Sequence, residues 1–373
     1  MDTKERVVFI DYLRFIACFM VMVVHSCEPF YLGGQGTFIL NHTNAVLVTA
    51  IDSFLRPCVP LFVMASSYLL FPVRTDAVTF YKRRTKRVLI PLIVWVLLYA
   101  LIPLYGSTYE FYKTGSVLDG LKQAVLNFPG ASGHLWFVYM ILGIYIVMPV
   151  FSPWIEKVSR KGERAFIALW LFTTLVPFLR LIAQGISGNA EIWGEANWNE
   201  FGLLYGVSGF IGYVVIGHYF RKYVGEISWG RTLAISLPLI IVGYAFSAGW
   251  FWSVMPKDFP VDAPLDLAIY MEKGWGFCSP GTAIMTIGFF LIIRKFNSAG
   301  WGYRHIILPV SGASYGMYLM HIFFLCFYTA VFQKTIPSTF AVIFLTAICS
   351  YITSFIASFA LSKIPKIGKY LVG

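Results

Sequence analysis

Four ionisable side chains lie in the first apolar stretch of the chain, residues 7–30: Asp11, Arg14, His25 and Glu28. Arg14 and His25 are eleven residues apart. At about 100° per residue, this spacing returns them to within roughly 20° of one helix face. Ionisable groups inside an apolar helix cost several kcal/mol unless they are paired or face a cavity, so this face is a candidate functional track. Asp11, three residues before Arg14, is its expected partner.

These residue types suit proton transfer beside an anionic ligand. A histidine changes its protonation state near neutral pH and takes a proton from a hydroxyl, whereas an arginine holds phosphate by charge and bidentate geometry. Glu28 lies one turn beyond His25, where it either orients the ring, binds an acceptor, or is an inert acid at a membrane interface. The structural alternative is a buried Asp11–Arg14 pair and a histidine hydrogen-bonded to a neighbouring helix.

Two arginines open the third apolar stretch. Arg84 and Arg87 stand at i and i+3, so on a helix they present two guanidiniums to one anionic neighbour such as a nucleotide. Basic residues are also usual in cytoplasmic loops, which is the plainer interpretation.

Three more residues stand at the outer side of expected helices. Arg56 is expected at the outer start of the second stretch, and a plain i,i+4 ion pair with Asp52, four residues earlier, is the structural alternative to a functional role. His134 begins the fourth stretch, and His321 lies in the ninth at a depth close to that of His25. A lone histidine there is more often a core residue, but its level makes His321 a candidate.

The composition limits what can position these side chains. The chain has 373 residues, of which 58% are hydrophobic and 13% charged, so a soluble enzyme is nearly excluded. The sequence predicts an all-α integral membrane protein, a bundle of about ten transmembrane helices in a single domain over 1–373 without a separate soluble domain. The expected helices are 7–30, 50–71, 87–105, 134–151, 164–183, 201–220, 232–254, 276–293, 306–331 and 338–362.

Lysine and arginine alternate between the connections. One set of segments holds about 21 of them and the opposite set about 6, which predicts that both termini are cytoplasmic. The net charge of +11 is therefore a topology signal, and nucleic acid is not an expected partner. On the opposite side, 116–127 has helical spacing, and 184–200 combines acids, amides and tryptophans that suit a sugar or an interfacial aromatic belt. The oligomeric state is not encoded in any recognisable pattern.

Familiar soluble-enzyme motifs are missing from the sequence. It contains no G-x-S-x-G, Walker or H-E-x-x-H pattern. Its six cysteines are scattered without a C-x-x-C pair, so neither a metal site nor a disulfide framework is expected.

A series of segments extends over almost the whole chain: IDYLRFIACFMVMVVH at 10–25, Arg56 before VPLFVMASSYL, Arg84 and Arg87 followed by VLIP, HLWFVYMILGIYIVMP at 134–149 and SYGMYLMH at 314–321. In this order the segments resemble the acyltransferase-3 family of multi-span membrane acyltransferases. One departure is Ser66-Ser67-Tyr68-Leu69, where the family usually has Ser-Gly-Tyr-Leu.

The resemblance implies a function. The chain looks particularly like stand-alone bacterial O-acetyltransferases of the cytoplasmic (inner) membrane. These take an acyl group, usually from acetyl-CoA, and transfer it to a hydroxyl of an envelope glycan or lipid-linked saccharide on the outer side. Acyl-CoA, the glycan and the bilayer are the expected partners, and no metal is expected.

The resemblance and the independent spacing also imply roles. Arg84 and Arg87 would hold the phosphates of the coenzyme, and Arg14 would guide the pantetheine arm toward His25. His25 would act as general base or form an acyl-histidine.

The same reasoning assigns the remaining candidates. Arg56, His134 and His321 would polarise the carbonyl or seat the sugar. The rival is a permease or flippase for a lipid-linked sugar or organic anion, in which the same charges line a translocation path.

Overall fold

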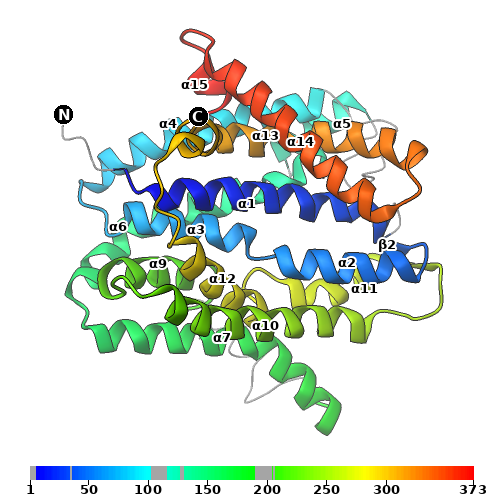
Figure 1. Cartoon of the computed structure of the whole chain (residues 1–373), viewed down its shortest axis with the longest axis horizontal. Coiled ribbons are helices and arrows are strands. Elements are labelled where there is room, and N and C mark those ends of the chain that lie inside the picture. Colours follow the sequence, from blue (N-terminus) through cyan, green and yellow to red (C-terminus); the bar gives the residue numbers. More distant parts are fainter. Residues whose placement is uncertain (1–5, 34–35, 102–115, 127–129, 190–203, 205) are drawn as a thin grey trace.

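The computed structural model describes residues 6–33, 36–101, 116–126, 130–189, 204 and 206–373. Long α-helices lie side by side along the long axis of the molecule (Figure 1). In the first half of the chain the elements are α1 (Val8–Cys27), η1 (Glu28–Phe30), β1 (Leu32–Gly33), β2 (Gly36–Ile39), α2 (His42–Leu55), α3 (Cys58–Leu70), α4 (Ala77–Leu101), α5 (Val117–Leu126), η3 (Gly130–Leu135), α6 (Trp136–Lys157) and α7 (Arg160–Ser187).

The second half continues the bundle and adds one strand and several short helices. Its elements are α9 (Ile211–Tyr223), α10 (Trp229–Val254), β3 (Val261–Pro264), α11 (Leu265–Met271), η5 (Glu272–Trp275), α12 (Pro280–Ile293), η6 (Tyr303–Ile307), α13 (Leu308–Thr335), α14 (Thr339–Ser362) and α15 (Gly368–Leu371). The N-terminal end of α1 and the short α15 both lie in the left half of the view in Figure 1.

The helices have the length and composition of a multi-pass membrane protein. Within the described residues, seven helices are long and apolar enough to cross a bilayer, or eight if the bent pair Leu265–Trp275 and Pro280–Ile293 is one crossing. Each of the ten expected stretches contains a helix. The all-α membrane class is thus confirmed. The count of ten crossings and the cytoplasmic position of both termini stay predictions, because α4 and α9 are not among the seven.

Helix α1 lies in the middle of the bundle. It packs against α3, α13 and α14 (Figure 1), and its buried side chains point in every direction around its axis. A helix that is apolar on all sides is stable where other helices surround it. Because of this central position, most side chains of α1 contact other parts of the protein rather than lipid.

Side-chain caps begin several of the crossing helices. The side chains of Asn41, Ser159, Ser228, Ser279 and Ser338 each accept a hydrogen bond from a backbone N–H in the first turn of the helix that follows. These bonds satisfy donors that the helix itself leaves unpaired.

The second crossing differs from the sequence prediction. It begins at His42 rather than at residue 50, because Asn41 caps α2. Arg56 therefore lies between α2 and α3, inside the 29-residue span His42–Leu70, and not at its outer start. Pro57 follows it, and since proline has no backbone N–H the helix is interrupted at this point.

A small sheet lies at the end of α1 opposite to its N-terminus. The strands pair antiparallel in the order β1-β2-β3, with Thr37 opposite Ala263 in the register of β2 and β3. The predicted helix at 116–127 is present as α5. The acids and tryptophans of the 184–200 segment all follow residue 189 and lie outside the described residues.

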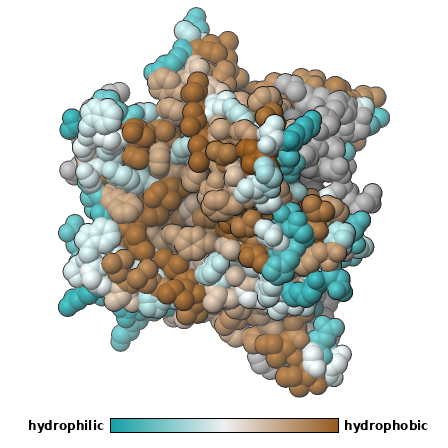
Figure 2. Space-filling model, turned by 45° about the vertical axis from the view of Figure 1, so that its right-hand side comes forward, coloured by the Kyte–Doolittle hydropathy of each residue, from teal (hydrophilic) through white to brown (hydrophobic). Residues whose placement is uncertain are grey.

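The surface carries an apolar band. In Figure 2, brown side chains gather across the middle of this face, and hydrophilic ones lie along its left and right margins. Large apolar side chains that are exposed to the surroundings of the protein include Ile146, Val150, Ile241 and Ile356. Such a continuous apolar surface suits the hydrocarbon core of a bilayer.

Close packing at one glycine gives a stability prediction. A Cβ at Gly212 in α9 would lie 2.0 Å from the ring of Trp170, which is fully buried. We expect Gly212→Ala to lower the free energy of unfolding by about 1–3 kcal/mol because the ring must shift. At Gly143 in α6 nothing lies within 4 Å of an added Cβ, so Gly143→Ala is the matched control. Loss of the monodisperse peak on heating in detergent measures both; equal melting temperatures would contradict the prediction.

Candidate active site

Two adjoining cavities lie inside the bundle. The first, of about 340 Å³, is lined by Arg14, Arg84 and Arg87, and we call it the arginine cavity. The second, of about 390 Å³, is lined by His25, and we call it the histidine cavity. Both cavities share four lining residues, which form the boundary between them: Val21, Val59, Phe137 and Tyr318.

The arginine cavity gathers three guanidiniums from two helices. Arg84 and Arg87 come from α4, which begins at Ala77 and so places them within the helix rather than at its start. The guanidinium carbon of Arg84 lies 5.5 Å from the centroid of the Phe80 ring and 5.8 Å from that of Tyr145. These aromatic faces support a cation while its N–H groups stay available to an anion.

Asp11 does not pair with Arg14 as the sequence suggested. Its carboxylate accepts hydrogen bonds from Arg6, at 2.7 and 2.9 Å, from the Tyr303 hydroxyl at 2.7 Å and from the Ser311 hydroxyl at 2.6 Å. Its oxygens are thereby used by other partners. Among the described residues the guanidinium of Arg14 makes no ion pair, so its charge is directed at the cavity that it lines.

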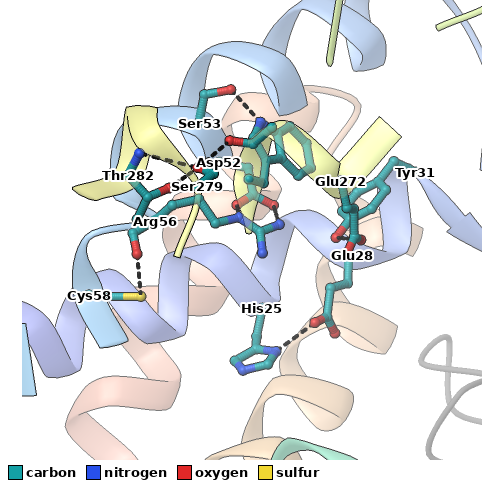
Figure 3. A network of polar contacts seen from close by, with 12 residues as sticks. His25, Glu28, Tyr31, Asp52, Ser53, Arg56, Cys58, Glu272, Ser279 and Thr282 are labelled. Carbon is teal, nitrogen blue, oxygen red and sulfur yellow. Dashed lines mark hydrogen bonds and ion pairs between the residues drawn. The ribbon is translucent and has the colours of Figure 1, made fainter. Parts of the chain in front are cut away.

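His25 is oriented by Glu28. The Nδ1 atom of His25 lies 2.7 Å from Oε1 of Glu28, across the junction of α1 and η1 (Figure 3). A carboxylate accepts a proton donor at this position, so Nδ1 carries the hydrogen and Nε2 has the free lone pair. This is the tautomer in which a histidine can accept a proton through Nε2.

Two further histidine rings lie next to His25. The ring centroid of His321, in α13, is 5.1 Å from that of His25 and 5.1 Å from that of His134. Nδ1 of His321 lies 2.6 Å from the carbonyl oxygen of Tyr318, which assigns its hydrogen to Nδ1. The Tyr318 hydroxyl donates to the carbonyl oxygen of His134. The three predicted histidines therefore form one cluster.

Arg56 and Asp52 form a buried ion pair beside this cluster. Nε of Arg56 is 2.6 Å from one carboxylate oxygen of Asp52, and Nη2 is 3.0 Å from the other. The Arg56 guanidinium also lies over the ring of Trp275, at 4.6 Å. In Figure 3 it lies between the Asp52 carboxylate and the His25 ring. The i,i+4 ion pair, which was the structural alternative for Arg56, is thus present.

Glu272 lines the histidine cavity, although the sequence analysis did not single it out. It lies in η5 and accepts a hydrogen bond of 2.8 Å from the hydroxyl of Tyr31, another residue of the cavity wall (Figure 3). Glu272 is also within electrostatic range of Arg56 and Glu28. The available signal was an acid that follows the apolar run of 267–271.

All eight candidate residues meet at the two cavities. Seven of them line one cavity or the other, and His321 lies directly behind His25. Along α1, the arginines therefore line one cavity and the histidines lie at the other. Within the described residues, the histidines, cysteines and acids form no group arranged to hold a metal ion, and all six cysteines are free.

Comparison with known proteins decides the family. The model of the acyltransferase domain matches residues 7–362, nearly the whole chain. The chain belongs to the acyltransferase-3 family. A segment of 138 residues is 26% identical to an amino-acid racemase of Enterococcus faecalis, covering 37% of this chain and 17% of that relative's length. No solved structure gives a significant match.

The geometry of the two cavities suits the chemistry of acyl transfer. An acyl transfer needs a group that takes a proton from the attacking nucleophile and donors that stabilise the developing oxyanion. The free Nε2 of His25 fits the first requirement. The guanidinium of Arg56, held at the same cavity by Asp52, fits the second.

Proposed function

We propose that this acyltransferase moves an acetyl group from acetyl-CoA to a hydroxyl of an envelope glycan or lipid-linked saccharide. The donor enters from the cytoplasmic side of a bacterial inner membrane, and the acceptor is on the outer side. The observation that carries the proposal is the pair of adjoining cavities, because one bears three guanidiniums and the other bears the oriented His25.

In this proposal the arginine cavity holds the donor. The phosphates of coenzyme A contact Arg84 and Arg87, and Arg14 guides the pantetheine arm past Val21 and Val59. A cavity of about 340 Å³ is smaller than a complete coenzyme, so the nucleotide end extends out of it. The thioester then lies at the boundary of the histidine cavity.

The proposed reaction is a direct transfer in which His25 first accepts and then returns one proton. Nε2 of His25 takes the proton of the acceptor hydroxyl while the hydroxyl oxygen attacks the thioester carbon. The carbonyl oxygen becomes negatively charged beside Arg56, whose guanidinium stabilises it. A carbon–oxygen bond forms, the carbon–sulfur bond breaks, and the proton passes from His25 to the departing thiolate. Glu28 keeps the ring of His25 in the reactive tautomer throughout.

Donor binding tests the first half of the proposal. In nanodiscs we expect saturable binding of acetyl-CoA to the wild-type protein, and weakening of at least about tenfold in the Arg84→Ala/Arg87→Ala variant, because two charge-assisted phosphate contacts are lost. Calorimetry or a ligand-dependent rise in melting temperature measures it.

The neighbouring Lys82→Ala/Arg83→Ala variant is the matched control. It also removes two positive charges from α4, but both side chains are exposed and neither lines the arginine cavity. Equal weakening in the two variants would show that only the general positive charge of this surface matters. Absence of binding by the folded wild type would favour the permease.

A further inference from the structure

Among the described residues, two carboxylates and one guanidinium line the histidine cavity, and a third carboxylate contacts that guanidinium. Glu28 and Glu272 line the cavity together with Arg56, and Asp52 contacts Arg56 from behind. With the three carboxylates ionised, the formal charge of this set is negative. The cavity is therefore an unfavourable place for an anion.

Arg56 does not reverse this balance. Its Nη2 atom donates a hydrogen bond to one carboxylate oxygen of Asp52, and its Nε atom lies 2.6 Å from the other in an ion-pair contact. The Nη1 atom has no hydrogen-bond partner among the described residues, although the side chain is only 8% exposed. This nitrogen can donate a hydrogen bond to one oxygen atom that is neutral or gains negative charge during the reaction, such as the carbonyl oxygen of a thioester.

Aromatic rings form the remaining wall. Trp136 and Phe277 are stacked with their centroids 5.1 Å apart and their planes at 27°, and both line the cavity. A ring face of this kind packs against the apolar face of a sugar or against a cation, and it is poorly suited to an anionic group.

We propose that the acceptor group entering the histidine cavity is uncharged or cationic, and that Glu272 and Glu28 exclude anionic acceptors. The chemical class is a neutral sugar hydroxyl, or a hydroxyl beside an amine, rather than one beside a carboxylate or phosphate. This inference rests on the proposed function, since it names the acceptor of the same site. Tyr31 holds the Glu272 carboxylate in place through its 2.8 Å hydrogen bond.

Charged thiol reagents test the electrostatic selection without any turnover. Leu32, on the wall of the histidine cavity, is replaced by cysteine, and the protein in nanodiscs reacts with trimethylammonium-ethyl or sulfonatoethyl methanethiosulfonate. Peptide mass spectrometry reads the modification at position 32 apart from the native cysteines. The rate measured with each reagent is divided by the rate at which the same reagent reacts with a small thiol free in solution. Phe277→Cys, at the same cavity, is the second position should Leu32→Cys fail to fold.

The cationic reagent is expected to react at least about tenfold faster than the anionic one, because each facing charge changes the two rates in opposite directions. Glu272→Gln should lower this ratio by about fivefold or more. Asp266→Asn removes an exposed charge from the adjacent α11 and should leave the ratio within about twofold.

Two outcomes would overturn the inference. One is an equal or faster reaction with the anionic reagent. The other is no reaction with either reagent at both positions, since the cavity would then be closed to a solute. Acetyl-CoA binding is measured on the same samples, so failure of the donor site and failure of the acceptor selection are distinguished.

Discussion

Replacing His25 by alanine is expected to lower acyl transfer by about 100- to 10,000-fold, the range that a positioned general base contributes. The side chain supplies the Nε2 atom at the histidine cavity, and the 2.7 Å contact between Nδ1 and Glu28 orients its ring. Acetyl-CoA binding should change little, because the three guanidiniums line the other cavity. Release of coenzyme A thiol in the presence of an acceptor extract measures the loss.

His305→Ala is the control for this substitution. His305 is an exposed histidine in η6 and lines neither cavity, so its loss should leave transfer within about twofold of wild type. If His25→Ala retained transfer within about threefold while folding normally, His25 would not be the base. A trapped acetyl group on His25 in the wild type would instead favour the acyl-histidine route.

Removing Arg56 alone is expected to cost about 3–5 kcal/mol of stability, because it leaves the carboxylate of Asp52 buried without its partner. Asp52 is fully buried and Arg56 is 7% exposed, so water cannot replace the lost contacts. Arg56→Met keeps most of the side-chain volume and removes the charge. Thermal unfolding in detergent, followed by loss of the monodisperse peak, measures the effect.

A double-mutant cycle separates the ion pair from the packing. Asp52→Asn/Arg56→Met should recover part of the stability that Arg56→Met loses, since no uncompensated charge remains. Arg231→Met, at an exposed position, should change the free energy of unfolding by about 0.5 kcal/mol or less. Additive effects of the two site substitutions would mean that Asp52 and Arg56 are not coupled.

Local spacing was a reliable guide where one helix decides the geometry. The pairing of Asp52 with Arg56 and the lining of adjoining cavities by Arg14 and His25 both follow from residues on continuous or nearly continuous helices. Side chains at i and i+4 are neighbours on any α-helix, and a spacing of eleven returns to the same face. These relations need no knowledge of how the helices pack.

Local spacing misled where a distant partner competes. Asp11 is three residues from Arg14, yet it contacts Arg6 and the hydroxyls of Tyr303 and Ser311, almost 300 residues away in the chain. The start of the second crossing was also misplaced, because hydropathy locates an apolar core and not the cap at Asn41. Hydrogen-bond partners and caps depend on the groups that surround a helix end.

The sequence by itself determined the all-α membrane class, the membership of the acyltransferase-3 family and the residue types that are available for its chemistry. Apolar runs of sufficient length must satisfy their backbone as helices in a bilayer, so class and approximate crossings follow from composition alone. Only the tertiary structure decided that three histidines from separate helices meet within 5.1 Å ring distances, and that Glu272 and Tyr31 complete their cavity. Such contacts join residues up to about 300 positions apart, and packing between helices, rather than any local pattern, selects them.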